Sequence, residues 1–171
     1  MEGFLNPNEI LKQVDLKESQ RAADFGAGSG GWVIPLAKKL EDGKVFALDI
    51  LEEPLSALKA KMKLEKVSNI ETIVADIEKG TRILSETLDL VLMTNLLFEC
   101  QDKKSVLSEG KRVLRNGGKI LIIDWKKESL FGPKGERVST EDLKRMTQEL
   151  GMAVEKEFDA GAYHYGLILV K

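Results

Sequence analysis

The chain has 171 residues, of which 43% are hydrophobic and 32% are charged, and its formal net charge is -2. This size and composition predict one globular domain that buries a core without disulfides. The charge balance excludes a global basic field that would attract nucleic acid. A single cysteine, Cys100, excludes an internal disulfide framework. With no leader and no apolar run near 18 residues, we expect a cytoplasmic protein without a membrane span.

Strands and helices are predicted in turn along the chain. Residues 1–20 form a lead-in, in which Asn6-Pro7-Asn8 begins a short helix and which is a possible lid. Strands are expected at 21–25, 44–50, 70–75, 88–93, 119–124, 154–158 and 163–170. Helices are expected at 32–40, from Pro54, after the capping residue Asp102, and from Ser139 to Leu150. Asn116-Gly117-Gly118 is expected as a turn and 126–138 as a loop.

This order predicts an α/β fold over residues 21–171. We expect a Rossmann-like, doubly wound sheet of seven strands, mostly parallel, with helices on both faces. The last two strands are joined by only four residues, 159–162, so they must be antiparallel. Ligands bind such sheets at the carboxyl ends of the strands. The polar residues expected at those ends are Asp24, Asp49, Asp76, Thr94, Asn95 and Asp124.

A glycine-rich turn joins the first strand to the following helix. It reads Asp24-Phe25-Gly26-Ala27-Gly28-Ser29-Gly30. Glycines at 26, 28 and 30 permit positive φ and let a ligand approach the main chain, where a helix N-terminus presents N–H groups. We therefore predict that this turn binds part of a nucleotide-like cofactor.

The turn alone leaves the cofactor open. Gly26, Gly28 and Gly31 satisfy the G-x-G-x-x-G spacing, and Asp49 ends the next strand as in NAD-binding proteins. However, the Asp24 carboxylate would lie close to a pyrophosphate, whereas it suits a ligand that carries an ammonium and a sulfonium. Asp24 could also be a simple strand-end carboxylate, and Thr94-Asn95 simple turn chemistry.

The combined motifs resemble the class I S-adenosylmethionine-dependent methyltransferases. The resemblance is carried by the glycine turn, by Asp49 after the second strand, by Asp76-Ile77 after the third, and by Leu-Arg-Asn-Gly-Gly-Lys before the fifth. It spans residues 20–171 and is strongest to the small quinone-biosynthesis-like and generic small-molecule members. The closing antiparallel strand is also typical of that family.

The resemblance implies a role for each position, with S-adenosylmethionine as cofactor and S-adenosylhomocysteine as product. Gly26, Ala27, Gly28 and Gly30 would approach the methionine and ribose portion, with Asp24 near the amino group. Asp49 would accept both ribose hydroxyls. Ile50 would pack on adenine, while Asp76 and the Ile77 N–H would bind its edge. Thr94 and Asn95 would line the channel to the acceptor.

Methyl transfer needs alignment and exclusion of water more than acid–base catalysis. If the acceptor must lose a proton, His164 is the first candidate base and Asp124 the second. His164 could equally pack at a strand edge. No metal-ligating cluster is apparent, and neither nucleic acid nor a particular oligomeric state is expected. An apolar lid of Phe4, Leu5, Leu130 and Phe131 would favour a small or lipophilic acceptor. An NAD-type oxidoreductase and a non-catalytic scaffold that needs a partner remain the alternatives.

Overall fold

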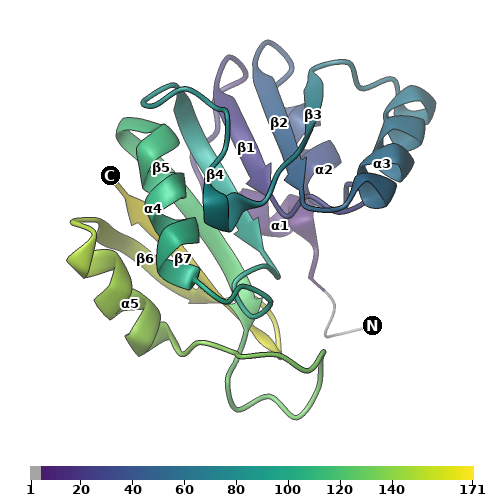
Figure 1. Ribbon diagram of the computed structural model, residues 1–171. Helices are drawn as coiled ribbons and strands as arrows, with labels where there is room; N and C mark the ends of the chain where they lie inside the picture. Colours follow the sequence, from purple (N-terminus) through teal and green to yellow (C-terminus); the bar gives the residue numbers. More distant parts are fainter. Residues whose placement is uncertain (1–4) are drawn as a thin grey trace.

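The computed structural model describes residues 5–171 and contains one seven-stranded sheet in the order β3-β2-β1-β4-β5-β7-β6 (Figure 1). The strands are β1 (Arg21–Phe25), β2 (Lys44–Asp49), β3 (Ile70–Val74), β4 (Leu88–Thr94), β5 (Leu114–Trp125), β6 (Ala153–Asp159) and β7 (His164–Val170). The helices are α1 (Pro7–Leu11), α2 (Val33–Lys39), α3 (Glu52–Glu65), the 3-10 helix η1 (Ile77–Lys79), α4 (Lys103–Val113) and α5 (Thr140–Glu149).

The pairing of the strands confirms the predicted topology. β1 lies between β2 and β4 and is parallel to both, which places the switch in strand order at β1. β7 is antiparallel to β6, as the short link between them requires, and it is also antiparallel to β5. The carboxyl ends of β1, β2, β4 and β5 therefore meet at one edge of the sheet, at the lower side of Figure 1.

Helices cover both faces of the sheet, and alternate residues of its central strands enter two separate cores. In β1, Ala23 and Phe25 belong to the core under α4 and α5, whereas Ala22 belongs to the core under α1, α2 and α3. All three side chains are fully buried. This alternation follows from the two-residue period of a strand, and it makes the sheet a rigid base for its carboxyl edge.

Three helix starts confirm the predicted capping residues. The Asn6 side chain accepts from the Asn8 N–H (3.1 Å), Asp102 accepts from the Ser105 N–H (3.0 Å), and Ser139 accepts from the Asp142 N–H (3.1 Å). Each bond satisfies one backbone donor that has no partner inside its helix.

Most boundaries agree with the sequence prediction to within one residue, and the two larger differences lie in β5 and α3. Asn116-Gly117-Gly118 lies inside β5 instead of forming a separate turn, because Gly117 N–H donates to Lys171 O (3.1 Å) and Lys171 N–H donates to Gly118 O (3.0 Å). These bonds to the end of the chain draw the glycines into the sheet. Helix α3 begins at Glu52, two residues before Pro54, which sits in the first turn where its missing N–H is not needed.

The lead-in packs as part of the core on one face. Ile10 and Leu11 of α1, and Val14 beyond it, are buried with residues of α2. Phe4, part of the predicted apolar lid, lies outside the described residues. Leu130 and Phe131 are 96% and 62% exposed, so in this structure they do not form the apolar lining that the lid prediction gave them. None of the described helices has the length and hydropathy that crossing a membrane requires.

Candidate functional site

The glycine turn is fixed to the neighbouring strand by its own backbone. The N–H groups of Gly26 and Ala27 both donate to Leu48 O of β2, each at 2.8 Å. Gly26 and Gly30 have φ of +77° and +99°, and Gly28 has φ of +53° with no atom within 4 Å of the position a Cβ would take. The turn therefore holds an open stretch of main chain at the entrance to α2, as the glycine pattern predicts.

Asp24 lies fully buried beneath this turn at the end of β1. Neither carboxylate oxygen has a hydrogen-bond partner within residues 5–171. Burial, and then the charge of Asp49, raise the pKa of Asp24 to about 8. A buried carboxylate without a partner is costly in a folded protein, so its surroundings fit a cationic ligand group that would compensate for the lost hydration.

Asp49 closes the other side of the turn at the end of β2. Its Oδ2 accepts from the Gly28 N–H (2.9 Å) and its Oδ1 accepts from the Leu51 N–H (3.0 Å). A carboxylate has about four acceptor positions, so two remain available toward solvent. The next side chain, Ile50, is 61% exposed and offers an apolar face to a flat ligand.

A hollow of about 190 Å³ brings six of the sequence-predicted residues together. They are Gly26, Asp49, Ile50, Asp76, Ile77 and Asn95. Glu78, Leu96, Glu99 and Cys100 also line it and were not expected. They follow β3 and β4 without any recognisable motif.

Asp76 is already engaged at the rim of this hollow. Its Oδ1 accepts from the Glu78 N–H (3.1 Å), and its Oδ2 pairs with Lys79 (2.8 Å). The hydrogen bond from Lys79 is the main cause that lowers the pKa of the half-buried Asp76. Asp76 is thus an ionised acceptor that also starts the turn of η1.

Thr94 ends β4 and Asn95 follows it, at the centre of the carboxyl edge. Thr94 is buried, and Asn95 has φ of +52° with its N–H donating to Ile123 O (2.8 Å). The Asn95 Oδ1 is buried and has no partner in the described part of the chain. Leu96 then packs against the glycine turn, where a Cβ on Gly26 would come 2.9 Å from Leu96 Cδ1. Close packing at this point therefore requires glycine at position 26.

Asp124, the second candidate base, has a different environment from Asp24. Its Oδ2 accepts from the Leu97 N–H (2.9 Å) and its Oδ1 accepts from the Trp125 N–H (2.7 Å). Burial raises its pKa to about 6, although these backbone hydrogen bonds oppose the rise. The carboxylate holds the chain after β4 against β5, which is a structural task that the sequence did not indicate.

His164, the first candidate base, is buried at the start of β7. Its ring lies 4.0 Å from that of Trp125, and both of its nitrogens lack a partner among residues 5–171, as does Trp125 Nε1. Burial, followed by the charges of Arg137 and Lys126, lowers the pKa of His164 to about 4. The imidazole is therefore neutral at physiological pH.

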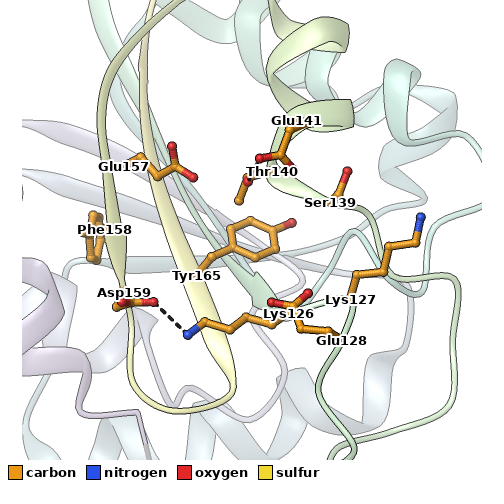
Figure 2. Close-up of a pocket in the computed structure, with 10 residues that line it drawn as sticks. All are labelled: Lys126, Lys127, Glu128, Ser139, Thr140, Glu141, Glu157, Phe158, Asp159 and Tyr165. Atoms are coloured by element: carbon orange, nitrogen blue, oxygen red, sulfur yellow. Dashed lines mark hydrogen bonds and ion pairs between the residues drawn. The ribbon is translucent and has the colours of Figure 1, made fainter.

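A second, larger hollow of about 580 Å³ opens between the start of α5 and strands β6 and β7 (Figure 2). Figure 2 shows Tyr165 at its centre, with the hydroxyl turned toward Ser139 and Thr140, and the Lys126–Asp159 ion pair (2.7 Å) below. The Tyr165 hydroxyl is buried and has no partner within residues 5–171. This hollow shares no residue with the glycine turn, so it is separate from the first one.

Comparison with known proteins places this geometry among methyltransferases. The sequence matches the family described as methyltransferase domain over residues 22–118, more than half of the chain. It is 30% identical over 125 residues to the demethylmenaquinone methyltransferase of Bacillus mycoides, covering 72% of this chain and 52% of that protein. The corresponding protein of Bacillus cereus is 29% identical with the same coverage. The chain thus spans about half the length of the curated relatives it matches.

A solved structure is similar over nearly the whole chain. The SAM-dependent methyltransferase from Aquifex aeolicus has a TM-score of 0.89 and 27% sequence identity, covering 98% of this chain and 90% of that one. The similarity extends beyond residues 22–118 and includes the antiparallel strands at the end of the sheet.

Proposed function

Because this chain belongs to the methyltransferase-domain family, whose S-adenosylmethionine-dependent members share its fold, we propose that it transfers the methyl group of S-adenosylmethionine to a small, lipophilic, quinol-like acceptor. The observation that carries the proposal is that the Asp24 carboxylate is buried beneath the glycine turn. It has no hydrogen-bond partner within residues 5–171. A pyrophosphate beside this carboxylate would add charge repulsion, whereas the ammonium of a methionine moiety would neutralise it. The family match also favours this cofactor over NAD.

The residues around the first hollow fit such a cofactor in size and chemistry. The open main chain at Gly26, Ala27, Gly28 and Gly30 would receive the methionine and ribose portion. The two free acceptor positions of Asp49 suit two ribose hydroxyls. Ile50 would cover one face of the adenine, and Asp76 with the Ile77 N–H would bind its edge, where the exocyclic amine is a donor and a ring nitrogen an acceptor.

When bound, the sulfonium supplies an activated methyl group and a neutral leaving group. The protein then has to align the acceptor and exclude water. Thr94 and Asn95 lie between the glycine turn and β5, and the buried Oδ1 of Asn95, unpartnered among the described residues, can receive a hydrogen bond from an acceptor hydroxyl. Trp125 and His164 would form the wall on the far side of the acceptor.

A quinol-like acceptor must lose one proton as it is methylated, either from a hydroxyl group or from the ring carbon that receives the methyl group. His164 is neutral and can receive it, but with a pKa of about 4 it is a weak base. Asp124 is held by two backbone donors and is less free to turn toward an acceptor. We therefore propose that the proton leaves to water and that His164 serves mainly to shape the acceptor site.

The choice of acceptor rests on the relatives. The Bacillus proteins that match this chain are named demethylmenaquinone methyltransferases, and a quinol-like acceptor for this chain follows that name. Nucleic acid remains an unexpected acceptor because the chain carries 26 basic and 28 acidic residues. The single buried cysteine suits the reducing cytoplasm, where we expect the protein to work.

Two measurements test this function. Calorimetric titration with S-adenosylmethionine, S-adenosylhomocysteine and NAD should show binding of the first two, lost in Asp49→Ala. Transfer of a tritiated methyl group to a short-chain demethylmenaquinol should then follow. Binding of NAD alone would support an oxidoreductase instead. Binding of the methyl donor without transfer to any acceptor would support a non-catalytic scaffold.

A further inference from the structure

The segment between β5 and α5, residues 126–138, is folded around the guanidinium of Arg137; we call it the Arg137 loop. Arg137 Nη1 donates to the carbonyls of Lys126 and Ser129, and Nη2 donates to those of Phe131 and Pro133. The guanidinium also lies 5.6 Å from the ring centroid of Trp125. Four carbonyls bound by one side chain fix the path of a segment that has no helix or strand of its own.

The tip of this loop presents two large apolar side chains to solvent. Leu130 is 96% exposed and Phe131 is 62% exposed. The Phe131 ring packs beside that of Tyr163 with centroids 5.1 Å apart. Gly132 lies so close to Trp125 that a Cβ there would come 2.5 Å from its ring. The backbone of the tip is therefore anchored while the apolar side chains point outward, an arrangement that typically marks an interaction site.

We propose that Leu130 and Phe131 insert into the interfacial region of an anionic lipid bilayer. The charge of the loop supports binding to an anionic bilayer. Residues 126–137 carry four basic and two acidic side chains, whereas in the whole chain acidic residues slightly outnumber basic ones. Lys127 and Lys134 have no ion-pair partner within the described residues. Exposed leucine and aromatic side chains flanked by lysines are the usual means by which a peripheral protein binds an anionic membrane surface.

The location of the loop gives this contact a consequence for the site. Figure 1 shows the loop after β5 projecting beyond the carboxyl ends of the parallel strands, the edge that also carries the glycine turn. Docking through the tip would turn this edge toward the bilayer. The inference depends on the loop alone and holds whichever acceptor is methylated.

Sedimentation with lipid vesicles tests the proposal. We expect the full chain to bind vesicles of phosphatidylcholine with about one third phosphatidylglycerol more tightly than pure phosphatidylcholine vesicles. The double variant Leu130→Ser/Phe131→Ser should weaken this binding by at least about tenfold. The matched control Leu64→Ser/Leu84→Ser removes two side chains that are 83% and 74% exposed elsewhere, and it should bind like the parent.

All four side chains are exposed, so both double variants should keep the unfolding temperature of the parent, and a thermal melt verifies this. Failure of the parent to bind anionic vesicles would overturn the proposal. So would equal loss in the control pair, or equal binding to neutral vesicles. A concentration-dependent dimer that disappears in Leu130→Ser/Phe131→Ser would assign the tip to a second copy of the chain and would also overturn it. Cofactor titration of the same variants keeps this outcome separate from the proposed methyl transfer.

Discussion

The substitution Asp24→Asn tests how much the buried carboxylate lowers the stability of the fold, separately from its proposed role in cofactor binding. In the folded protein the pKa of Asp24 is raised to about 8, against 3.8 for an ordinary aspartate. Between these values the unfolded chain loses its proton while the folded protein keeps it. The free energy of unfolding therefore falls by about 1.4 kcal/mol for each pH unit. Above pH 8 both states are ionised and this dependence ends.

From pH 6 to pH 7.5 the loss due to Asp24 alone is about 2 kcal/mol. An asparagine amide does not titrate, so Asp24→Asn should lack this part of the pH dependence. The unpaired amide of the variant can itself cost about 1–3 kcal/mol, but that cost does not change with pH. Asp124 and His164 titrate in both proteins, so their contributions to the pH dependence of unfolding cancel when the two proteins are compared. The difference in pH slope is thus the measurable signature of Asp24.

Urea denaturation of parent and variant at pH 6 and pH 7.5 measures this difference. A thermal melt should show it as a change of about 4–8 °C for a chain of this length. The variant should also lose binding of S-adenosylhomocysteine, since its amide cannot neutralise an ammonium. Equal pH slopes for the two proteins would show that Asp24 is ionised in the free protein, and would refute the reasoning from its burial.

Four further predictions concern the glycine turn, Asp24 and His164. The affinity of the parent for S-adenosylhomocysteine should rise between pH 6 and 7.5, by up to about tenfold per pH unit, because Asp24 must release its proton to pair with an ammonium; calorimetry showing a flat profile would contradict this. Gly30→Ala should lower the free energy of unfolding in urea by about 2–3 kcal/mol, because its Cβ would come 2.6 Å from Leu58 Cδ1 at a positive φ. Gly28→Ala, with open space around it, should cost about 1 kcal/mol but still weaken cofactor binding. His164→Phe should keep methyl transfer within about tenfold of the parent, whereas a loss beyond about a hundredfold would identify His164 as the base.

The order of strands and the place of the glycine turn could be predicted because they depend on local patterns. Alternating apolar strands, a glycine run after the first strand and a four-residue link before the last one leave few alternatives for the topology. The position of Asp49 opposite Gly28 follows from the same pattern, since parallel strands end at one edge. Within β5, however, the glycines at 117 and 118 pair with Lys171, a partner more than fifty residues away. No local signal announces such a contact.

The conformation of the Arg137 loop also depends on contacts that no local sequence pattern predicts. Residues 126–138 read as an unstructured connection because glycine and proline lie at its centre. Its path is decided by one guanidinium that binds four carbonyls, and its closeness to Trp125 depends on Gly132. Side-chain hydrogen bonds to irregular backbone have no period in the sequence, so the exposure of Phe131 could be seen only in three dimensions.

Asp24 and Asp124 show why hydrogen bonding, and not position alone, separates a ligand-binding carboxylate from a structural one. Both end or nearly end a parallel strand, both are buried, and in both cases burial raises the pKa. Asp124 receives backbone donors from Leu97 and Trp125, and its pKa rises only to about 6. Asp24 receives none from residues 5–171, and its pKa rises to about 8. The carboxylate that the fold leaves unsatisfied is the one that a cationic ligand can stabilise, and this larger cost to folding is the reason why we propose Asp24, and not Asp124, as a binding residue.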